Sequence, residues 1–121
     1  MATATSADSA LETFREALRA HDEQALLDAY ADDAIVIVYS ERSRPSSARR
    51  IEGRAQIEAW VHDVMSRNLT HTIADEVVSG DRFACTETCL YPSGEQVVGA
   101  YVCDVRDGRI ARQVGAEAWD E

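Results

Sequence analysis

The spacing of apolar residues changes once along this chain, close to Asn68, and that change limits the folds it can adopt. Before Asn68 the apolar residues recur at the spacing of amphipathic helices. After it they alternate with polar residues in four segments, residues 69–78, 82–91, 95–105 and 109–119. The intervening sequences SGD, PSG and DG are turn signals, so the second half predicts an antiparallel meander of four strands.

The first half predicts three helices and one further strand. Ser9 and Glu12 form a capping box before the amphipathic segment LETFREALRAH. Asp22 is placed to cap a second helix, EQALLDAYA, with Tyr30 on its inner face. Gly53 opens a third helix, RAQIEAWVHDVMSRN, which carries the clearest apolar stripe of the chain. Between the last two helices, AIVIVYS predicts a strand and ERSRPSSARR a polar loop.

These elements define an α+β fold with three helices packed on one face of a curved, mostly antiparallel sheet. The 121 residues suffice for one domain, which we assign to residues 9–121, preceded by a flexible tail at residues 1–8. No repeat or low-complexity segment interrupts the pattern.

Composition excludes several partners. The net charge of −10 repels phosphate backbones, so nucleic acid is not an expected ligand. No apolar run approaches the ~20 residues of a membrane span, and the first residues lack the features of a secretory signal. All twelve basic residues are arginine, which is typical of a GC-rich bacterial genome. Because a secretory signal is missing, a cytoplasmic location is expected.

The three cysteines predict reduced thiols, because an odd number fits a reducing compartment. Cys85 and Cys89 lie on one predicted strand, about 13 Å apart at ~3.3 Å per residue. That separation is too great for a disulfide or a shared zinc ion. Buried structural thiols are the favoured interpretation, and no metal site or cofactor is predicted.

Several segments together resemble one family. FREALRAHDEQALLDAYADDA, IEGRAQIEAW and VRDGRIARQ are similar to the SnoaL-like branch of the nuclear-transport-factor-2-like superfamily, over a match from about Ala10 to Glu121. The resemblance implies a cone, in which the sheet curls around three helices and leaves a mostly apolar internal pocket. It also implies a homodimer formed through the outer sheet face. Five residues are expected to line the pocket or to form the core behind it: Tyr30, Val36, Val38, Trp60 and Trp119.

The resemblance also indicates which known chemistries are missing. The catalytic base of ketosteroid isomerases falls on Val38, and the first tyrosine of their oxyanion hole falls on Phe14. Only Tyr30 remains from that network. We therefore expect Val38 to be part of the pocket wall. The residue pattern of the epoxide hydrolases is absent as well.

His71 occupies the position of the catalytic histidine in dehydratase relatives. Their partner aspartate, near the end of the first helix, is replaced here by Arg19. His71 is thus expected to lack the carboxylate that would orient it. It is either a base in the pocket or a structural or surface histidine.

Further polar candidates depend on strand faces that the sequence leaves open. Glu117 shares a face with Trp119, either in the pocket as a general acid or base or toward solvent, and Gly115 could seat a bulge that reverses this face. Glu87, Cys89 and Tyr91 share one face of their strand, and the sequence leaves open whether that face points inward, because a slip of one residue exchanges the two faces. If it points inward, Glu87 and Tyr91 would join His71 in a polar cluster. The same question applies to Tyr101.

The polar loop carries Arg42, Arg44, Arg49 and Arg50. These side chains are either simply solvated, or they flank the mouth of the pocket and attract an anionic ligand. His21, at the end of the first helix, is interpreted as a cap.

Two functions remain. In the first, a small, largely apolar organic molecule binds in the pocket and undergoes acid–base chemistry without a cofactor, as in isomerisation, dehydration, cyclisation or hydrolysis. His71 and Glu117 would then be the acid–base pair, and the ligand would contact Phe14, Tyr30, Val38, Tyr39, Trp60, Glu87, Tyr91, Tyr101 and Trp119. In the second, the protein is a non-catalytic ligand-binding or dimerisation module.

Overall fold

The computed structural model describes residues 6–120. Its helices are α1 (Ser6–Arg19), α2 (Glu23–Asp28) and α3 (Gly53–Ser66), with a short 3-10 turn at Pro45–Ser47. The strands are β1 (Tyr30–Tyr39), β2 (Arg49–Glu52), β3 (Thr70–Ser79), β4 (Arg82–Leu90), β5 (Gln96–Arg106) and β6 (Arg109–Trp119). The predicted α+β class is confirmed.

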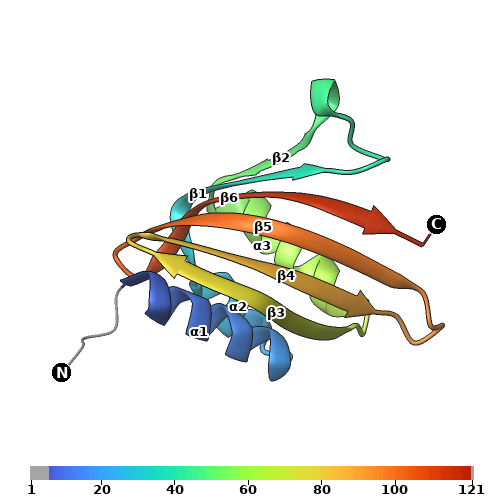
Figure 1. Cartoon of the computed structure of the whole chain (residues 1–121), viewed down its shortest axis with the longest axis horizontal. Coiled ribbons are helices and arrows are strands. Elements are labelled where there is room, and N and C mark those ends of the chain that lie inside the picture. Colours follow the sequence, from blue (N-terminus) through green and yellow to red (C-terminus); the bar gives the residue numbers. More distant parts are fainter. Residues whose placement is uncertain (1–5, 121) are drawn as a thin grey trace.

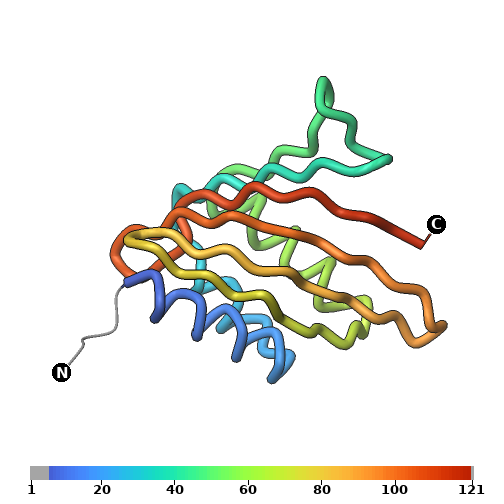
Figure 2. Tube along the Cα trace, viewed as in Figure 1, coloured from blue at the N-terminus to red at the C-terminus, as the bar shows by residue number. Residues whose placement is uncertain are grey.

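The six strands form one curled but open sheet in the order β2-β1-β6-β5-β4-β3 (Figure 1). β1 and β6 run parallel, and all other neighbouring strands run antiparallel. The parallel pair joins segments that are far apart in the sequence, as the cyan and red traces in Figure 2 show. α1 packs against β3 to β6, and α3 packs against β1 and β2. The apolar core lies between these helices and the sheet.

The N-terminal helix begins earlier than predicted. α1 already includes Ser6, so Ser9 is not its cap, and residues 6–8 belong to the helix rather than to a tail. Residues 1–5 of the predicted tail lie outside the described part of the chain. No described helix has the length and apolar character needed to span a membrane.

The junction between α1 and α2 is stabilised mainly by the backbone. His21 adopts a positive φ of 55° and its amide donates to Leu18, while the Asp22 amide donates to Ala17. This pair of bonds is a Schellman motif, so the His21 backbone, and not its charge, ends the helix. The Asp22 carboxylate then accepts from the Ala25 amide at 3.0 Å, which confirms the predicted cap of α2.

Two elements differ from the prediction between residues 29 and 52. Tyr30 begins β1 instead of continuing α2, which ends at Asp28. The edge strand β2 begins in the last two residues of the predicted loop, and it pairs with β1 from Arg49 to Glu52. Ile51 is the single buried residue of β2. The strand is therefore held by main-chain hydrogen bonds to β1, and its polar side chains carry no alternating pattern that sequence reasoning could detect.

The meander is observed within one residue of its predicted limits. Asp107 and Gly108 both have positive φ, 54° and 77°, as a tight hairpin turn requires. The irregular register between β5 and β6 lies at Asp104 and Val105, and not at Gly115, which pairs regularly with Tyr101. Residues 113, 115, 117 and 119 therefore share the inner face of β6.

Candidate functional site

The inner face of the sheet and α3 enclose a cavity of about 200 Å³ beneath the loop between β1 and β2. Its apolar wall consists of Val38, Trp60, Val64, Leu69, Val97 and Trp119. Polar groups are added by Glu87 and Cys89 of β4, by Tyr91 just after β4, by Tyr101 of β5 and by Glu117 of β6. The loop and its surroundings contribute Ser40, Arg42, Ser43, Arg49 and Arg67.

The structure resolves the strand faces that the sequence left open. Glu87 lies on the inner face of β4, 7% exposed, while its neighbours Thr86 and Thr88 belong to the opposite face. Tyr101 is also buried, at 8% exposure. Glu117 points to the same cavity as Trp119 because no bulge intervenes at Gly115.

The remaining predicted residues lie elsewhere. Phe14 and Tyr30 line a smaller cavity of about 30 Å³ deeper among the helices, which also reaches Trp60, Glu87 and Tyr101. Tyr39 lines neither cavity, because it is on the opposite face of β1 from Val38. His71 lines neither cavity, and it lies behind Glu87 as seen from the larger one.

Glu117 is held by two donors. Its Oε2 accepts from the Tyr101 hydroxyl and its Oε1 from the Trp119 indole nitrogen, both at 3.3 Å. Burial raises the pKa of Tyr101 well above its ordinary value, and the charges of Glu87 and Glu117 raise it further. Tyr101 therefore remains protonated and serves as a hydrogen-bond donor in the cavity.

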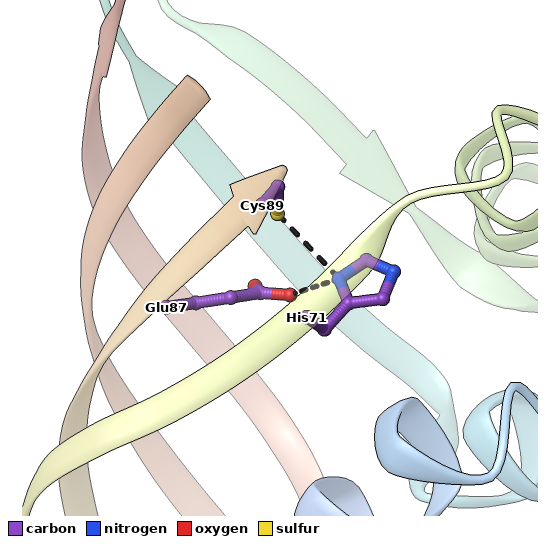
Figure 3. Close-up of side chains that lie close together, drawn as sticks. All are labelled: His71, Glu87 and Cys89. Carbon is purple, nitrogen blue, oxygen red and sulfur yellow. Dashed lines mark hydrogen bonds and ion pairs between the residues drawn. The ribbon is translucent and has the colours of Figure 1, made fainter. Parts of the chain in front are cut away.

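His71 has a carboxylate partner, contrary to the expectation that it would lack one. Its Nδ1 lies 2.7 Å from Oε2 of Glu87 and 3.5 Å from Sγ of Cys89 (Figure 3). The partner comes from β4 and not from α1, because the register pairs His71 with Cys89 and brings Glu87 alongside on the inner face. The His71 side chain is 0% exposed and that of Glu87 is 9% exposed.

The second ring nitrogen of His71 is buried without a hydrogen-bond partner among the described residues. In Figure 3 it points away from Glu87 and Cys89. The ring of His21 lies nearby, with its centroid 6.5 Å from that of His71, and its own Nε2 contacts the Met65 carbonyl oxygen at 2.9 Å. When Nδ1 donates to Glu87, Nε2 is a buried acceptor, and both polar contacts of the ring, with Glu87 and Cys89, are made through Nδ1.

His71, Glu87 and Cys89 are also the residues best placed to hold a metal ion. Among the described histidine, cysteine, aspartate and glutamate side chains, these are the only three whose potential ligand atoms all lie within 4.8 Å of one another. The sequence grouped His71 with Glu87 and Tyr91 on the condition that their strand face points inward, but it predicted no metal site, because the three ligands come from two strands. A metal would have to replace the His71–Glu87 hydrogen bond and deprotonate Cys89, whose pKa burial raises far above its ordinary value.

Tyr30 and Gln113 form a second buried polar pair, which the sequence did not predict. The Tyr30 hydroxyl donates to Oε1 of Gln113 at 2.7 Å, and both residues are almost fully buried. Burial raises the pKa of Tyr30 well above its ordinary value, so this hydroxyl is a donor as well. The signal for Gln113 was its place two residues before Gly115, on the face that also carries Glu117.

The three helices, the curled mixed sheet and the cavity between them share the fold of an NTF2-like protein from Mesorhizobium loti, which is 21% identical with a TM-score of 0.74 over 97% of each chain. The sequence signature of the SnoaL-like domain matches residues 11–113, so the chain belongs to the SnoaL-like domain family. No curated protein matches the sequence.

Solved structures share this fold at low sequence identity. A proposed ketosteroid isomerase from Kribbella flavida DSM 17836 is 18% identical, with a TM-score of 0.76 over 97% of this chain and 82% of the other. A proposed polyketide cyclase from Sinorhizobium meliloti is 23% identical, with a TM-score of 0.65 over 88% and 92%. A computationally designed 17-OHP binder is 19% identical, with a TM-score of 0.73 over 98% and 99%.

Proposed function

We propose that this protein binds a small, largely apolar organic molecule in the larger cavity and exchanges a proton with it. The observation that carries the proposal is the convergence of two carboxylates, Glu87 and Glu117, on a wall of tryptophan, valine and leucine side chains. Carboxylates in such surroundings are suited to general acid–base chemistry. Isomerisation, dehydration, cyclisation and hydrolysis all include a proton transfer of this kind.

The two carboxylates have different supports. Glu117 is oriented by Tyr101 and Trp119, which leaves its remaining lone pairs for a ligand in the cavity. Glu87 is hydrogen-bonded to His71, which does not itself reach the cavity. In this proposal Glu87 and Glu117 are the groups that touch the ligand, and His71 acts as a positioning residue for Glu87. This assignment changes the pair of His71 and Glu117 that the sequence suggested.

The alternative is a non-catalytic binding module. It is favoured by Val38, an apolar residue at the position of the ketosteroid isomerase base, and by the similarity to a designed 17-OHP binder. Both functions require the cavity to accept an apolar molecule. They differ in whether the bound molecule exchanges a proton with the protein.

Binding is tested with 2-tetralone, a neutral bicyclic ketone. The chain has two tryptophans, and both line the cavity, so saturable quenching of tryptophan fluorescence reports occupancy. Val97→Phe fills the cavity from β5 and should weaken binding at least about tenfold, because it occupies the space of the ligand. Val98→Phe, on the outer face, should leave the affinity unchanged. No saturable quenching, or equal loss in both variants, would refute the cavity as a ligand site.

We further propose a homodimer formed through the outer sheet face. Leu90, Val98 and Val102 are 42%, 44% and 48% exposed on neighbouring strands of that face. Exposed apolar groups of this kind are typical of interaction surfaces. Light scattering should give twice the chain mass for the parent protein and the monomer mass for Val98→Glu/Val102→Glu. A monomeric parent protein would contradict the proposal.

We also propose a cytoplasmic location, which the three free thiols fit.

A further inference from the structure

Three guanidinium groups surround the larger cavity, although they come from separate parts of the chain. Arg42 lies in the loop after β1, Arg49 begins β2, and Arg67 follows α3. Arg44 and Arg50, the other arginines of the loop region, do not line this cavity. Two of the four arginines of the loop region, Arg42 and Arg49, therefore line the cavity together with Arg67 from the end of α3.

Aromatic side chains connect two of these cations. Arg67 donates to the Tyr91 hydroxyl at 3.3 Å, and the Tyr91 ring lies 6.5 Å from that of Trp119. The Arg42 guanidinium lies over the Trp119 ring, 4.3 Å from its centroid. Cation–π contact and hydrogen bonding hold Arg42 and Arg67 at the cavity without any ligand. The positive groups are thus positioned before an anion arrives.

Arg49 and Arg67 differ in their charge pairing. Arg67 is paired with Asp63 at 2.5 Å, whereas Arg49 forms no ion pair with any described residue. Its neighbour Arg50 is paired with Glu52. In a chain with a net charge of −10, arginines grouped at one cavity depart from the average surface charge. Arg49 belongs to the edge strand β2, whereas Glu87 and Glu117 come from β4 and β6 further along the same sheet.

We infer that the ligand is an amphipathic anion, an aromatic or alicyclic skeleton that carries one carboxylate. The skeleton packs against Trp60 and Trp119, and the carboxylate is bound by Arg42 and Arg49. Guanidinium groups match the planar geometry of a carboxylate. This inference rests on the proposed binding function and specifies the class of ligand. It also orients the ligand, because its anionic end is attracted to the arginines and repelled by Glu87 and Glu117.

The experiment compares 2-naphthoate with 2-naphthamide, which have the same skeleton and differ in charge. We expect the parent protein to bind the anion more tightly, with an affinity that falls as salt is added. Arg49→Gln should weaken 2-naphthoate about threefold and Arg42→Gln/Arg49→Gln about tenfold, while the affinity for 2-naphthamide changes less than about twofold. Both arginines are exposed, so the variants should fold, as circular dichroism will verify.

Arg50→Gln is the matched control, because it removes the same charge from the adjacent residue of β2 without touching the cavity. It should leave both affinities unchanged. Equal binding of the two probes, or equal weakening of 2-naphthoate by Arg50→Gln and Arg49→Gln, would overturn the anionic ligand. In either case continued binding of 2-naphthamide would leave the proposed cavity function intact. If neither probe binds, the inference and the proposed function both fail.

Discussion

The buried polar residues of this protein are arranged in pairs across the sheet. Tyr30 with Gln113, Tyr101 with Glu117, and His71 with Glu87 each join a donor to an acceptor on another strand. Burial of a polar group is costly unless such a partner is present. The pairs therefore allow polar atoms to surround two cavities inside an otherwise apolar core.

The contribution of a single buried pair to stability is tested most directly at the Tyr30–Gln113 hydrogen bond. Tyr30→Phe leaves Oε1 of Gln113 buried with only the distant Cys103 thiol, at 3.8 Å, as a donor. We expect the free energy of unfolding to fall by about 1–3 kcal/mol, measured by urea denaturation. Tyr39→Phe is the control, because Tyr39 is only half-buried and outside both cavities. Similar losses in the two variants would show that the buried bond contributes little.

The strands β5 and β6 are shaped around one aromatic ring. Tyr101 lies across Gly99 and Gly115, and a Cβ added to either glycine would overlap its ring. The absence of these two side chains lets Tyr101 lie flat on the sheet, where its hydroxyl reaches Glu117. The glycines thereby shape the floor of the cavity.

Gly115→Ala should displace Tyr101 toward the cavity. We expect a loss of about 1–3 kcal/mol in the free energy of unfolding, because the added methyl group overpacks a buried position. Binding of 2-tetralone should weaken in the same variant. Ala116→Val adds volume at the next residue on the exposed outer face and should change stability by less than about 0.5 kcal/mol. A fully stable Gly115→Ala variant with normal binding would contradict this view of the ring.

Local patterns predicted most of the elements, and long-range register determined the site. The Asp22 cap and the Asp107–Gly108 turn depend on residues close in sequence, so they could be predicted. Strand β2 could not be predicted, because it is defined by its pairing with β1 and not by a local sequence pattern. The contact between His71 and Glu87 likewise depends on the register of β3 and β4, which a slip of one residue would abolish.

At the scale of the whole molecule, the fold provides a cavity but does not specify its chemistry. The strands that carry Val38, Glu87, Tyr101 and Glu117 are brought together by the curl of the sheet, and α3 covers them with Trp60. Related structures with this fold are named for different activities and for binding alone. Function is therefore decided by the side chains inside the cavity.

The measurement that tests proton transfer most directly is the exchange of the α-protons of 2-tetralone for deuterium in D₂O, followed by proton NMR. The account predicts exchange well above the buffer rate in the parent protein. Glu117→Gln and Glu87→Gln should each reduce the catalysed rate about 100-fold, the lower end of what general acid–base groups contribute. Glu95→Gln, at an exposed turn position, should not change it. If 2-tetralone binds and yet exchanges only at the buffer rate, the catalytic account is wrong and the protein is a binding module.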